Sequence, residues 1–321
     1  MTKLISLIIP IYNVEAYIYA CLSSVIDQLS DAIEVILVND GTPDQSMEII
    51  IELLKGLSLE KQTCFQILQQ ENQGQSVARN HALAIATGEY IAFLDADDVL
   101  EEDYFSVLFS KIKLYHPDII QFKSSRFHDD LSQKITFHVG AKLQGLYENS
   151  DQIQQHVFNQ SAWFPWLNIY KRSLFTAEIL FPIGVYYEDA AVVPQLFLKA
   201  KHVLFIENYL YAYRYNPTGS LMNISAKNIE KHIYSFKYII DFYSMKLKSD
   251  SIFSPNLVAL TQGYISFLLK HKGIKTAFLV YQELHLQHKP IDLTRLEKRG
   301  NILFYKFGPA FLLFAQLIGR E

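Results

Sequence analysis

The chain has 321 residues, 50% of them hydrophobic and 14% aromatic, so it can bury a large core and is expected to form one larger and one smaller domain. Its formal net charge is −4 without a long basic block, which argues against a nucleic-acid-binding protein that neutralises phosphates. Both cysteines, Cys21 and Cys64, lie in apolar stretches, and we expect the reduced core thiols of a cytoplasmic protein. The apolar run at the N-terminus is broken by Pro10 and Asn13 and is too short for a signal peptide.

Short apolar runs alternate with helical patterns in the first half of the chain. The predicted strands cover residues 4–11, 33–38, 65–68, 90–94 and 119–122. The predicted helices between them cover residues 14–29, 45–57, 76–86 and 102–115. Because the strand runs are almost continuously apolar, both of their faces should be covered, as in a parallel sheet between helices. Ligands of such sheets bind at the carboxyl ends of the strands.

Polar residues follow several of these strands at the point where each is predicted to end. Tyr12 and Asn13 follow the first strand, Asp40 follows the second, and residues 95–98 follow the fourth. Residues 72–80 add a glycine turn and a serine N-cap candidate before a helix. The carboxyl ends of parallel strands meet at one edge of a sheet, so we expect these groups to converge there and to form a ligand site.

Three carboxylates, those of Asp95, Asp97 and Asp98, stand where an apolar run should leave the sheet. Carboxylates are costly to desolvate, and a cluster of them repels itself unless a cation or a donor-rich ligand holds it together. The simplest interpretation is a divalent metal site, because hard cations prefer oxygen ligands. We interpret Asp98 as a local cap for a helix predicted near Glu101, rather than as a second metal ligand.

The same segments resemble the inverting glycosyltransferases of family 2, whose nucleotide-diphospho-sugar-binding fold is called GT-A. The resemblance runs through residues 6–13, 38–44, 72–80 and 88–98. It implies an α/β fold with a mostly parallel sheet between helices, followed by a C-terminal helical region. We therefore expect a GT-A catalytic domain over residues 1–222 and a helical region, membrane-associating or oligomerising, over residues 223–321.

The resemblance also implies roles for individual residues. The expected nucleotide-sugar-binding residues are Pro10, Tyr12, Asn13, Asp40, Arg79, Asp95, Ala96, Arg214 and Ser220. Asp40 and the turn of residues 10–13 would bracket the base and ribose of the nucleotide, and Asp95 would lie by the ribose. Asp97 would be the principal protein ligand of a Mg²⁺ or Mn²⁺ ion bound to the diphosphate. Such an ion would meet the negative charge that develops on the departing phosphate.

Between residues 163 and 220 the periodicity fades, and the sequence is aromatic and loop-like. Within it, Glu188 and Asp189 precede an apolar helical stretch and resemble the acidic pair that supplies the catalytic base in this family. An inverting transfer needs one carboxylate to take the proton of the acceptor hydroxyl as it attacks the anomeric carbon. We expect Asp189 to be that base, with Glu188 as the alternative. An acidic pair that only starts a helix and interacts with its dipole is the remaining interpretation.

Two further segments resemble parts of the family that face the diphosphate and the acceptor. Arg214 and Ser220 would close over the diphosphate, because guanidinium and hydroxyl donors suit phosphate oxygens; an aromatic strand ending in a turn is the alternative. Trp166 would stack on an acceptor sugar, with a buried core tryptophan as the alternative. Asn168 stands where the family usually carries a lysine, so either Lys171 or Arg172 supplies the missing cation, or the acceptor or donor contact differs in this protein.

From about Ala226 the pattern changes to helices, predicted over residues 228–247, 255–271 and 274–286. The last apolar segment, residues 302–318, is interrupted by Lys306 and a Gly-Pro pair and is short for a membrane span. Basic residues beside its bulky apolar ones suit an interfacial helix on an anionic inner leaflet. A helix packed on the protein or in a dimer interface is the alternative.

The expected protein is a cytoplasmic bacterial-type glycosyltransferase, peripheral on the inner membrane, that uses a divalent metal ion and a nucleotide-sugar donor, most simply a UDP-sugar. The resemblance implies transfer of a hexose or hexosamine to a glycan or lipid-linked acceptor in the synthesis of capsule, O-antigen or lipooligosaccharide. A non-catalytic nucleotide-sugar-binding scaffold and a sugar nucleotidyltransferase are the alternatives. The latter usually needs a glycine-rich, basic triphosphate loop near the N-terminus, which residues 10–16 lack.

Overall fold

The computed structural model describes residues 3–216 and 225–317. The chain divides into two compact units. Residues 1–150, 162–184 and 192–219 form the first, which we call the sheet unit; residues 151–161, 185–191 and 220–321 form the second, which we call the helical unit. The predicted boundary at residue 222 lies outside the described residues, and two earlier segments belong to the helical unit. The assignment of catalysis to residues 1–222 stays a prediction.

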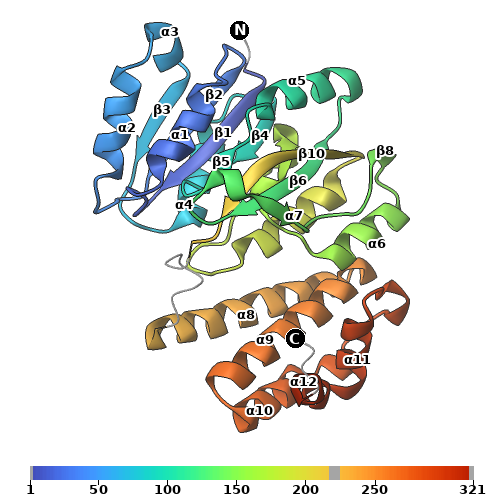
Figure 1. Ribbon diagram of the computed structural model, residues 1–321. Coiled ribbons are helices and arrows are strands. Elements are labelled where there is room, and N and C mark those ends of the chain that lie inside the picture. Colours follow the sequence, from blue (N-terminus) through green and yellow to red (C-terminus); the bar gives the residue numbers. More distant parts are fainter. Residues whose placement is uncertain (1–2, 217–224, 318–321) are drawn as a thin grey trace. The chain divides into compact units, whose positions relative to one another are not determined.

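Within the described residues, ten strands of the sheet unit form one sheet (Figure 1). They are β1 (Ile5–Ile11), β2 (Ile33–Asn39), β3 (Phe65–Gln69), β4 (Tyr90–Phe93), β5 (Val99–Leu100), β6 (Ile119–Phe127), β7 (Ile135–Phe137), β8 (Gly145–Glu148), β9 (Asn168–Lys171) and β10 (His202–Arg214). Their order is β3-β2-β1-β4-β9-β6-β10-β5, with β7 beside β6 and β8 beside β10. Strands β3, β2, β1 and β4 pair in parallel, as do β6 and β10, whereas β9 lies antiparallel between β4 and β6.

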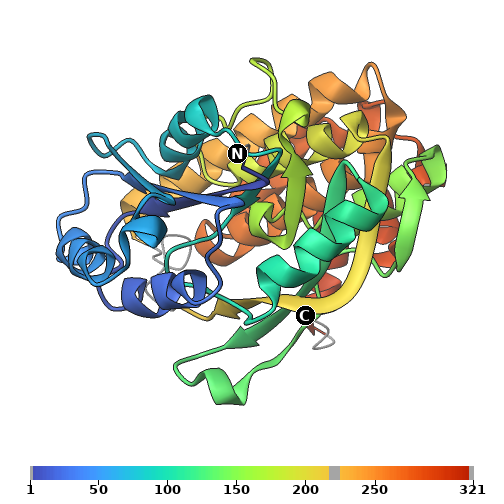
Figure 2. The same cartoon turned by 90° about the horizontal axis from the view of Figure 1, so that it is seen from above.

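Helices cover both faces of this sheet, as its apolar strands predicted. The helices of the sheet unit are α1 (Ile18–Ile26), α2 (Ser46–Lys55), α3 (Leu59–Gln62), α4 (Gln75–Ile85), α5 (Tyr104–Tyr115) and most of α7 (Glu188–Lys199). Figure 2 shows α4 on one side of the sheet and α1 and α5 on the other. The main core includes Leu7 and Val35 of the strands with Leu22 of α1 and Leu108 of α5. The predicted α/β fold is confirmed, but the sheet is mixed rather than mostly parallel, because five of the nine strand pairings within the described residues are antiparallel.

The region after Trp163 is more regular than its sequence predicted. Besides the predicted helical stretch, which is α7, it contains β9 and the strand β10, which has 13 residues. The register of β10 against β6 shifts between Phe205 and Tyr209, and again between Tyr209 and Tyr211. Such irregularities break the two-residue alternation by which a strand is recognised in sequence. The expectation of loops was therefore wrong here, and an aromatic strand carries this part of the chain.

The helical unit is arranged around α9 (Ser254–His271), half of whose residues are buried. The other helices of this unit are α6 (Asp151–Gln160), α8 (Ala226–Leu247), α10 (Ile274–Leu284), α11 (Arg299–Phe307) and α12 (Pro309–Leu317), all of which contact α9. Among the described residues, one segment, Ser251–His271, is long and apolar enough to cross a membrane by length and composition alone. Of its apolar window, 61% is buried in the protein, as in a core helix.

The apolar segment near the C-terminus forms two short helices rather than one. The break between α11 and α12 falls at Gly308, whose φ of 57° lies in the left-handed region. A Cβ atom at this position would lie 2.7 Å from the ring of Tyr281, so a larger residue does not fit without displacing that side chain. Neither helix has the length of a membrane span.

Candidate active site

The carboxylate of Asp40 lies just beyond the carboxyl end of β2, and this residue is 2% exposed. It accepts hydrogen bonds from the backbone N–H groups of Gln73 and Gly74, at 2.9 and 2.8 Å, and from Nε2 of Gln70 at 2.8 Å. Gly74 precedes α4 with a φ of 90°, which glycine adopts without strain. Asp40 therefore ties the start of α4 to the end of β2, at the edge of the sheet where the sequence predicted a cluster.

The turn after β1 lies at the same edge, because β1 pairs in parallel with both β2 and β4. Pro10 is within β1, and the Tyr12 side chain beyond the strand is 47% exposed. Asn13 has a φ of 55°, and its N–H donates to Oγ1 of Thr42 at 2.8 Å. An exposed aromatic ring at this edge of the sheet is suited to contact a flat ligand such as a nucleotide base.

Arg79 extends from α4 to the acidic turn after β4. Its Nη2 atom lies 2.8 Å from Oδ1 of Asp95, and its guanidinium lies 5.3 Å from the centre of the Phe181 ring. Arg79 is 2% exposed, whereas the side chain of Asp95 is 31% exposed. Arg79 is thus a buried partner of the acidic turn rather than a solvated surface residue, and the Asp95 carboxylate is paired but still reaches solvent.

Asp98 is 1% exposed, and its partners come from β10. Its Oδ2 accepts the Tyr211 hydroxyl at 2.6 Å, and its Oδ1 accepts the backbone N–H of Arg214 at 2.6 Å. The Tyr211 hydroxyl in turn accepts the N–H of Asp95 at 3.2 Å. The prediction that Asp98 caps a helix was wrong, because α5 begins only at Tyr104 and the carboxylate binds a strand 113 residues away in sequence.

Asp97 follows the buried Ala96 and is itself half-buried. Its Oδ2 accepts Nδ2 of Asn216 at 3.0 Å. Its backbone carbonyl accepts Nε of Arg214 at 2.8 Å. The end of β10 and the residues after it therefore bind the acidic turn at three points. These are the side chain of Asp98, the backbone carbonyl of Asp97 and the side chain of Asp97.

The three carboxylates create a region of concentrated negative charge. Burial raises the pKa of the Asp97 carboxyl, and the nearby charge of Asp95 raises this pKa further. The hydrogen bond from Asn216 acts in the opposite direction and lowers the pKa. Burial also raises the pKa of Asp98 well above its ordinary value, with the charges of Asp97 and Asp95 adding to the shift. A divalent cation near Asp95 and Asp97 would relieve this repulsion, and carboxylate oxygens are fitting ligands.

The guanidinium of Arg214 packs against the acidic turn, and this residue is only 8% exposed. Its Nη1 atom donates to the carbonyl of His128 at 3.1 Å, and the group lies 4.4 Å from the centre of the Phe127 ring. Arg214 thus orders the turn, while its contact with a diphosphate stays a prediction. Ser220 lies outside the described residues.

Trp166 is a core residue, so the predicted acceptor contact was wrong. The residue is 3% exposed, and its indole stacks on Tyr211 and on Phe164, with ring centres 4.4 and 5.0 Å apart. Asn168 is fully buried, and its Oδ1 accepts Nε2 of Gln121 at 2.9 Å. This amide belongs to a buried hydrogen-bond network, where a lysine ammonium group would be costly to desolvate.

The predicted acidic pair, Glu188 and Asp189, lies in the helical unit, in the first turn of α7. Glu188 is 3% exposed, whereas Asp189 is half-buried. Oδ1 of Asp189 accepts the N–H of Ala190 at 2.8 Å. A carboxylate that reaches solvent can contact an incoming hydroxyl group, so the exposure of the pair favours Asp189 over Glu188 as a proton acceptor.

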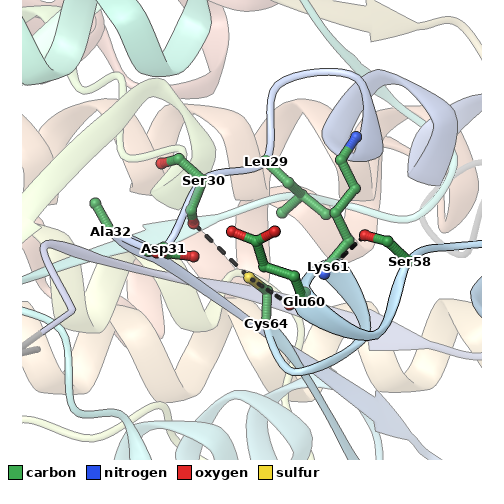
Figure 3. A pocket seen from close by; sticks show the side chains of 8 residues that line it. All are labelled: Leu29, Ser30, Asp31, Ala32, Ser58, Glu60, Lys61 and Cys64. Atoms are coloured by element: carbon green, nitrogen blue, oxygen red, sulfur yellow. Dashed lines mark hydrogen bonds between the residues drawn. The ribbon is translucent and has the colours of Figure 1, made fainter.

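A pocket of about 530 Å³ lies elsewhere in the sheet unit (Figure 3). It is lined by Leu29, Ser30, Asp31, Ala32, Ser58, Glu60, Lys61 and Cys64. Ala32 and Cys64 directly precede β2 and β3, so the pocket is at the amino ends of these strands, whereas Asp40 follows the carboxyl end of β2. Because parallel sheets bind ligands at the carboxyl ends of their strands, we do not assign the candidate site to this pocket.

Breaking the link between Asp98 and Tyr211 should destabilise the protein. We expect Tyr211→Phe to lower the free energy of unfolding by about 1–3 kcal/mol, because a buried carboxylate oxygen loses its donor. The Asp98→Ala and Tyr211→Phe effects should be less than additive in the double variant, because both remove the same interaction. Urea unfolding measures these values, with Tyr209→Phe on the half-exposed part of β10 as the control. Strictly additive effects would contradict a direct link.

The chain is similar in sequence and in fold to known proteins. The sequence model of the family described as Glycosyl transferase family 2 matches residues 6–165. The chain is 34% identical over 232 residues to glycosyltransferase GlyA of Streptococcus pneumoniae, a match that covers 68% of this chain but only 32% of GlyA. It is 32% identical over 253 residues to the uncharacterized glycosyltransferase EpsJ of Bacillus subtilis, covering 76% of this chain and 71% of EpsJ.

Among solved structures, S. aureus TarS 1–349 in complex with UDP-GlcNAc is similar to this chain. The TM-score is 0.63 at 21% identity, over 89% of this chain and 79% of that one. At this identity the similarity establishes the fold, which is GT-A. The match to EpsJ over most of both chains, together with the family match over residues 6–165, establishes that this chain is a glycosyltransferase and belongs to glycosyltransferase family 2.

Proposed function

We propose that this glycosyltransferase is metal-dependent and inverting, and that it moves a sugar from a nucleotide-sugar to an acceptor hydroxyl. The observation that carries the proposal is the acidic turn after β4. Asp95 and Asp97 both reach solvent, one paired with Arg79 and the other bonded to Asn216. Asp98 lies next to them in the same turn and is buried.

Asp97 is the residue that would hold a Mg²⁺ or Mn²⁺ ion, with Asp95 beside it. When bound, such an ion would supply positive charge to the diphosphate as it leaves. Among residues 3–216 and 225–317, no three His, Cys, Asp or Glu side chains form a group that could hold a metal ion. The remaining ligands would therefore be water and oxygen atoms of the donor phosphates, which is the usual situation for Mg²⁺.

The donor that we propose is a UDP-sugar. The TarS structure contains UDP-GlcNAc, and this chain shares its fold, which supports a uridine nucleotide by analogy alone. The exposed ring of Tyr12 and the carboxylate of Asp40 are at the edge where base and ribose would bind. Assays with several UDP-sugars would identify the sugar that is transferred.

Asp189 is the proposed catalytic base. Its carboxylate would accept the proton of the acceptor hydroxyl while the hydroxyl oxygen forms a bond to the anomeric carbon. The bond between that carbon and the diphosphate oxygen breaks on the opposite face, and the nucleoside diphosphate leaves with the electron pair. The products are an inverted glycoside, a protonated Asp189 and the nucleoside diphosphate.

Asp97→Ala should abolish metal-dependent nucleotide binding and leave the fold intact. We would measure thermal unfolding with UDP, GDP, CDP and dTDP, each with Mn²⁺, with Mg²⁺ and with chelator. A nucleotide at 100 times its dissociation constant stabilises the folded protein by about 2.7 kcal/mol, and the variant should lose this shift. Asp129→Ala, at an exposed carboxylate of the same unit, is the matched control. A variant that keeps the full shift would remove Asp97 from the donor site.

Asp189→Asn should remove transfer and spare donor binding. The amide has almost the shape of the carboxylate but cannot accept the proton, so we expect the rate to fall by about 10²–10⁴-fold. The release of UDP from UDP-sugars in the presence of Mn²⁺ measures the rate, and the thermal shift with UDP measures binding. Glu188→Gln is the comparison, because it tests the alternative base. An active Asp189→Asn variant would refute the assignment.

We further propose that the enzyme acts in the cytoplasm, at the inner leaflet of the membrane, on a glycan or lipid-linked acceptor of a surface polysaccharide. The face of α11 and α12 supports this location. Leu303, Phe307 and Phe314 are 39%, 62% and 62% exposed, which is unusual for such large apolar side chains. Arg299 and Lys306 are exposed in α11, four residues before and three residues after Leu303.

The net charge also differs between the two parts of the sequence. Residues 223–321 carry 14 Lys and Arg against 7 Asp and Glu, a net charge of +7, whereas residues 1–222 carry a net charge of −11. Bulky apolar side chains beside basic ones are typical of interfacial helices on anionic lipids. The positive net charge of residues 223–321 supports an anionic lipid surface as the partner of these helices, and the experiment below separates this partner from a second copy of the chain.

Replacement of both phenylalanines, Phe307→Ser with Phe314→Ser, should weaken co-sedimentation with vesicles of phosphatidylcholine and phosphatidylglycerol by about tenfold or more, because each ring buries apolar area in the lipid. High salt should also weaken binding. Leu59→Ser with Leu114→Ser, at exposed apolar positions of the sheet unit, is the matched control. Unchanged sedimentation, or a shift from dimer to monomer in its place, would contradict the membrane role.

A further inference from the structure

The segment that carries the acidic pair, residues 186–190, is bonded to helix α8 within the helical unit. The N–H of Tyr186 donates to Oγ of Ser235 at 2.9 Å. The same hydroxyl donates to the carbonyl of Lys231 at 2.7 Å, one turn earlier in α8. Ser235 is fully buried, so both hydrogen bonds are protected from water. The chain is thus fixed to α8 just before the pair.

Tyr187 holds the next position in an unusual conformation. Its φ is 62°, in the left-handed region that residues other than glycine seldom occupy. Its ring packs on Phe236, with centres 4.7 Å apart, and its hydroxyl lies 2.7 Å from Nδ1 of His232. Burial lowers the pKa of His232, and burial together with the charge of Asp189 raises the pKa of Tyr187. The phenol therefore keeps its proton, and a hydrogen bond joins its oxygen to Nδ1 of His232.

The residue after the pair is held by a third side chain of α8. Pro194 lies inside α7 and has no N–H group, so it cannot donate to the carbonyl of Ala190, four residues earlier. The hydroxyl of Tyr243 donates to that carbonyl at 2.7 Å instead. Tyr243 is 1% exposed, and burial and the charge of Asp189 raise its pKa, which keeps the phenol protonated.

We propose that α8 positions the catalytic carboxylate, with Ser235, His232 and Tyr243 as positioning residues that fix the backbone on both sides of Asp189. The proposal rests on the proposed role of Asp189 as the base. All of these contacts lie within the helical unit, which therefore fixes the backbone around Asp189 by itself. A displacement of about 1 Å at a reacting group can cost about 10² in rate, so these bonds are expected to matter for turnover more than for donor binding.

The test compares Ser235→Ala and Tyr243→Phe with two controls on the same helix. Ser244→Ala removes a hydroxyl that donates to the carbonyl of Ile240 at 2.6 Å within α8, and Tyr238→Phe changes a ring that is 41% exposed. The activity measured is the release of UDP from UDP-glucose, UDP-galactose, UDP-GlcNAc and UDP-GalNAc with Mn²⁺, with water as the acceptor. The thermal shift with UDP and Mn²⁺ measures donor binding in each variant.

We expect kcat to fall by at least tenfold in Ser235→Ala and Tyr243→Phe, with the KM for the donor and the UDP shift unchanged, and both controls to match the parent protein. Ser235→Thr keeps the hydroxyl and should restore most of the activity. If Asp189→Asn is inactive but both variants match the controls, the positioning role is overturned while the proposed function stands. A fall in kcat accompanied by an equal loss of the UDP shift, or without rescue in Ser235→Thr, also overturns the positioning role. An active Asp189→Asn refutes the base itself.

Discussion

The buried carboxylate of Asp98 is the constraint on which the candidate site depends. It receives the Tyr211 hydroxyl and the Arg214 N–H from β10, and so joins the parallel half of the sheet to a strand far away in sequence. An ionised group this deeply buried would be strongly unfavourable without such donors. The same turn contains Asp95 and Asp97, so the bonds that satisfy Asp98 also fix the two carboxylates that reach solvent. The fold and the candidate site therefore share one set of contacts.

Around that constraint, each carboxylate of the edge has a different partner. Asp40 is bonded to backbone N–H groups at the start of α4, and Asp95 is paired with a buried guanidinium. Asp97 is bonded to the neutral amide of Asn216. An ion pair already neutralises Asp95, whereas a hydrogen bond from an amide leaves the full charge on Asp97. This difference gives a physical reason why Asp97, rather than Asp95, is the proposed principal ligand of a cation.

Much of this arrangement could be predicted, because it depends on local patterns. The strands β1, β2 and β4 are continuous apolar runs, and the polar residues that follow them, Asp40 and Asp97 among them, must share an edge once the strands are parallel. The partners of Asp98 could not be predicted, since they depend on which strand pairs with the turn. The first part of β10 was not predicted because its register shifts hide the alternation, and its aromatic end was considered as a strand only as an alternative. Trp166 was misassigned because a stretch of aromatic residues does not show which rings stack on one another.

The hydrogen bond from Tyr243 to the carbonyl of Ala190, which Pro194 leaves without its helical donor, has a consequence for how this family can vary. A proline inside a helix frees one carbonyl, and here the side chain of another helix replaces the missing donor. The two positions are therefore not independent. A relative with any other residue at the position of Pro194 regains the N–H and no longer needs a hydroxyl opposite it, whereas a relative that keeps the proline does. Among homologous sequences, tyrosine at the second position should thus co-vary with proline at the first, which would record the contact in the evolutionary history of the chain.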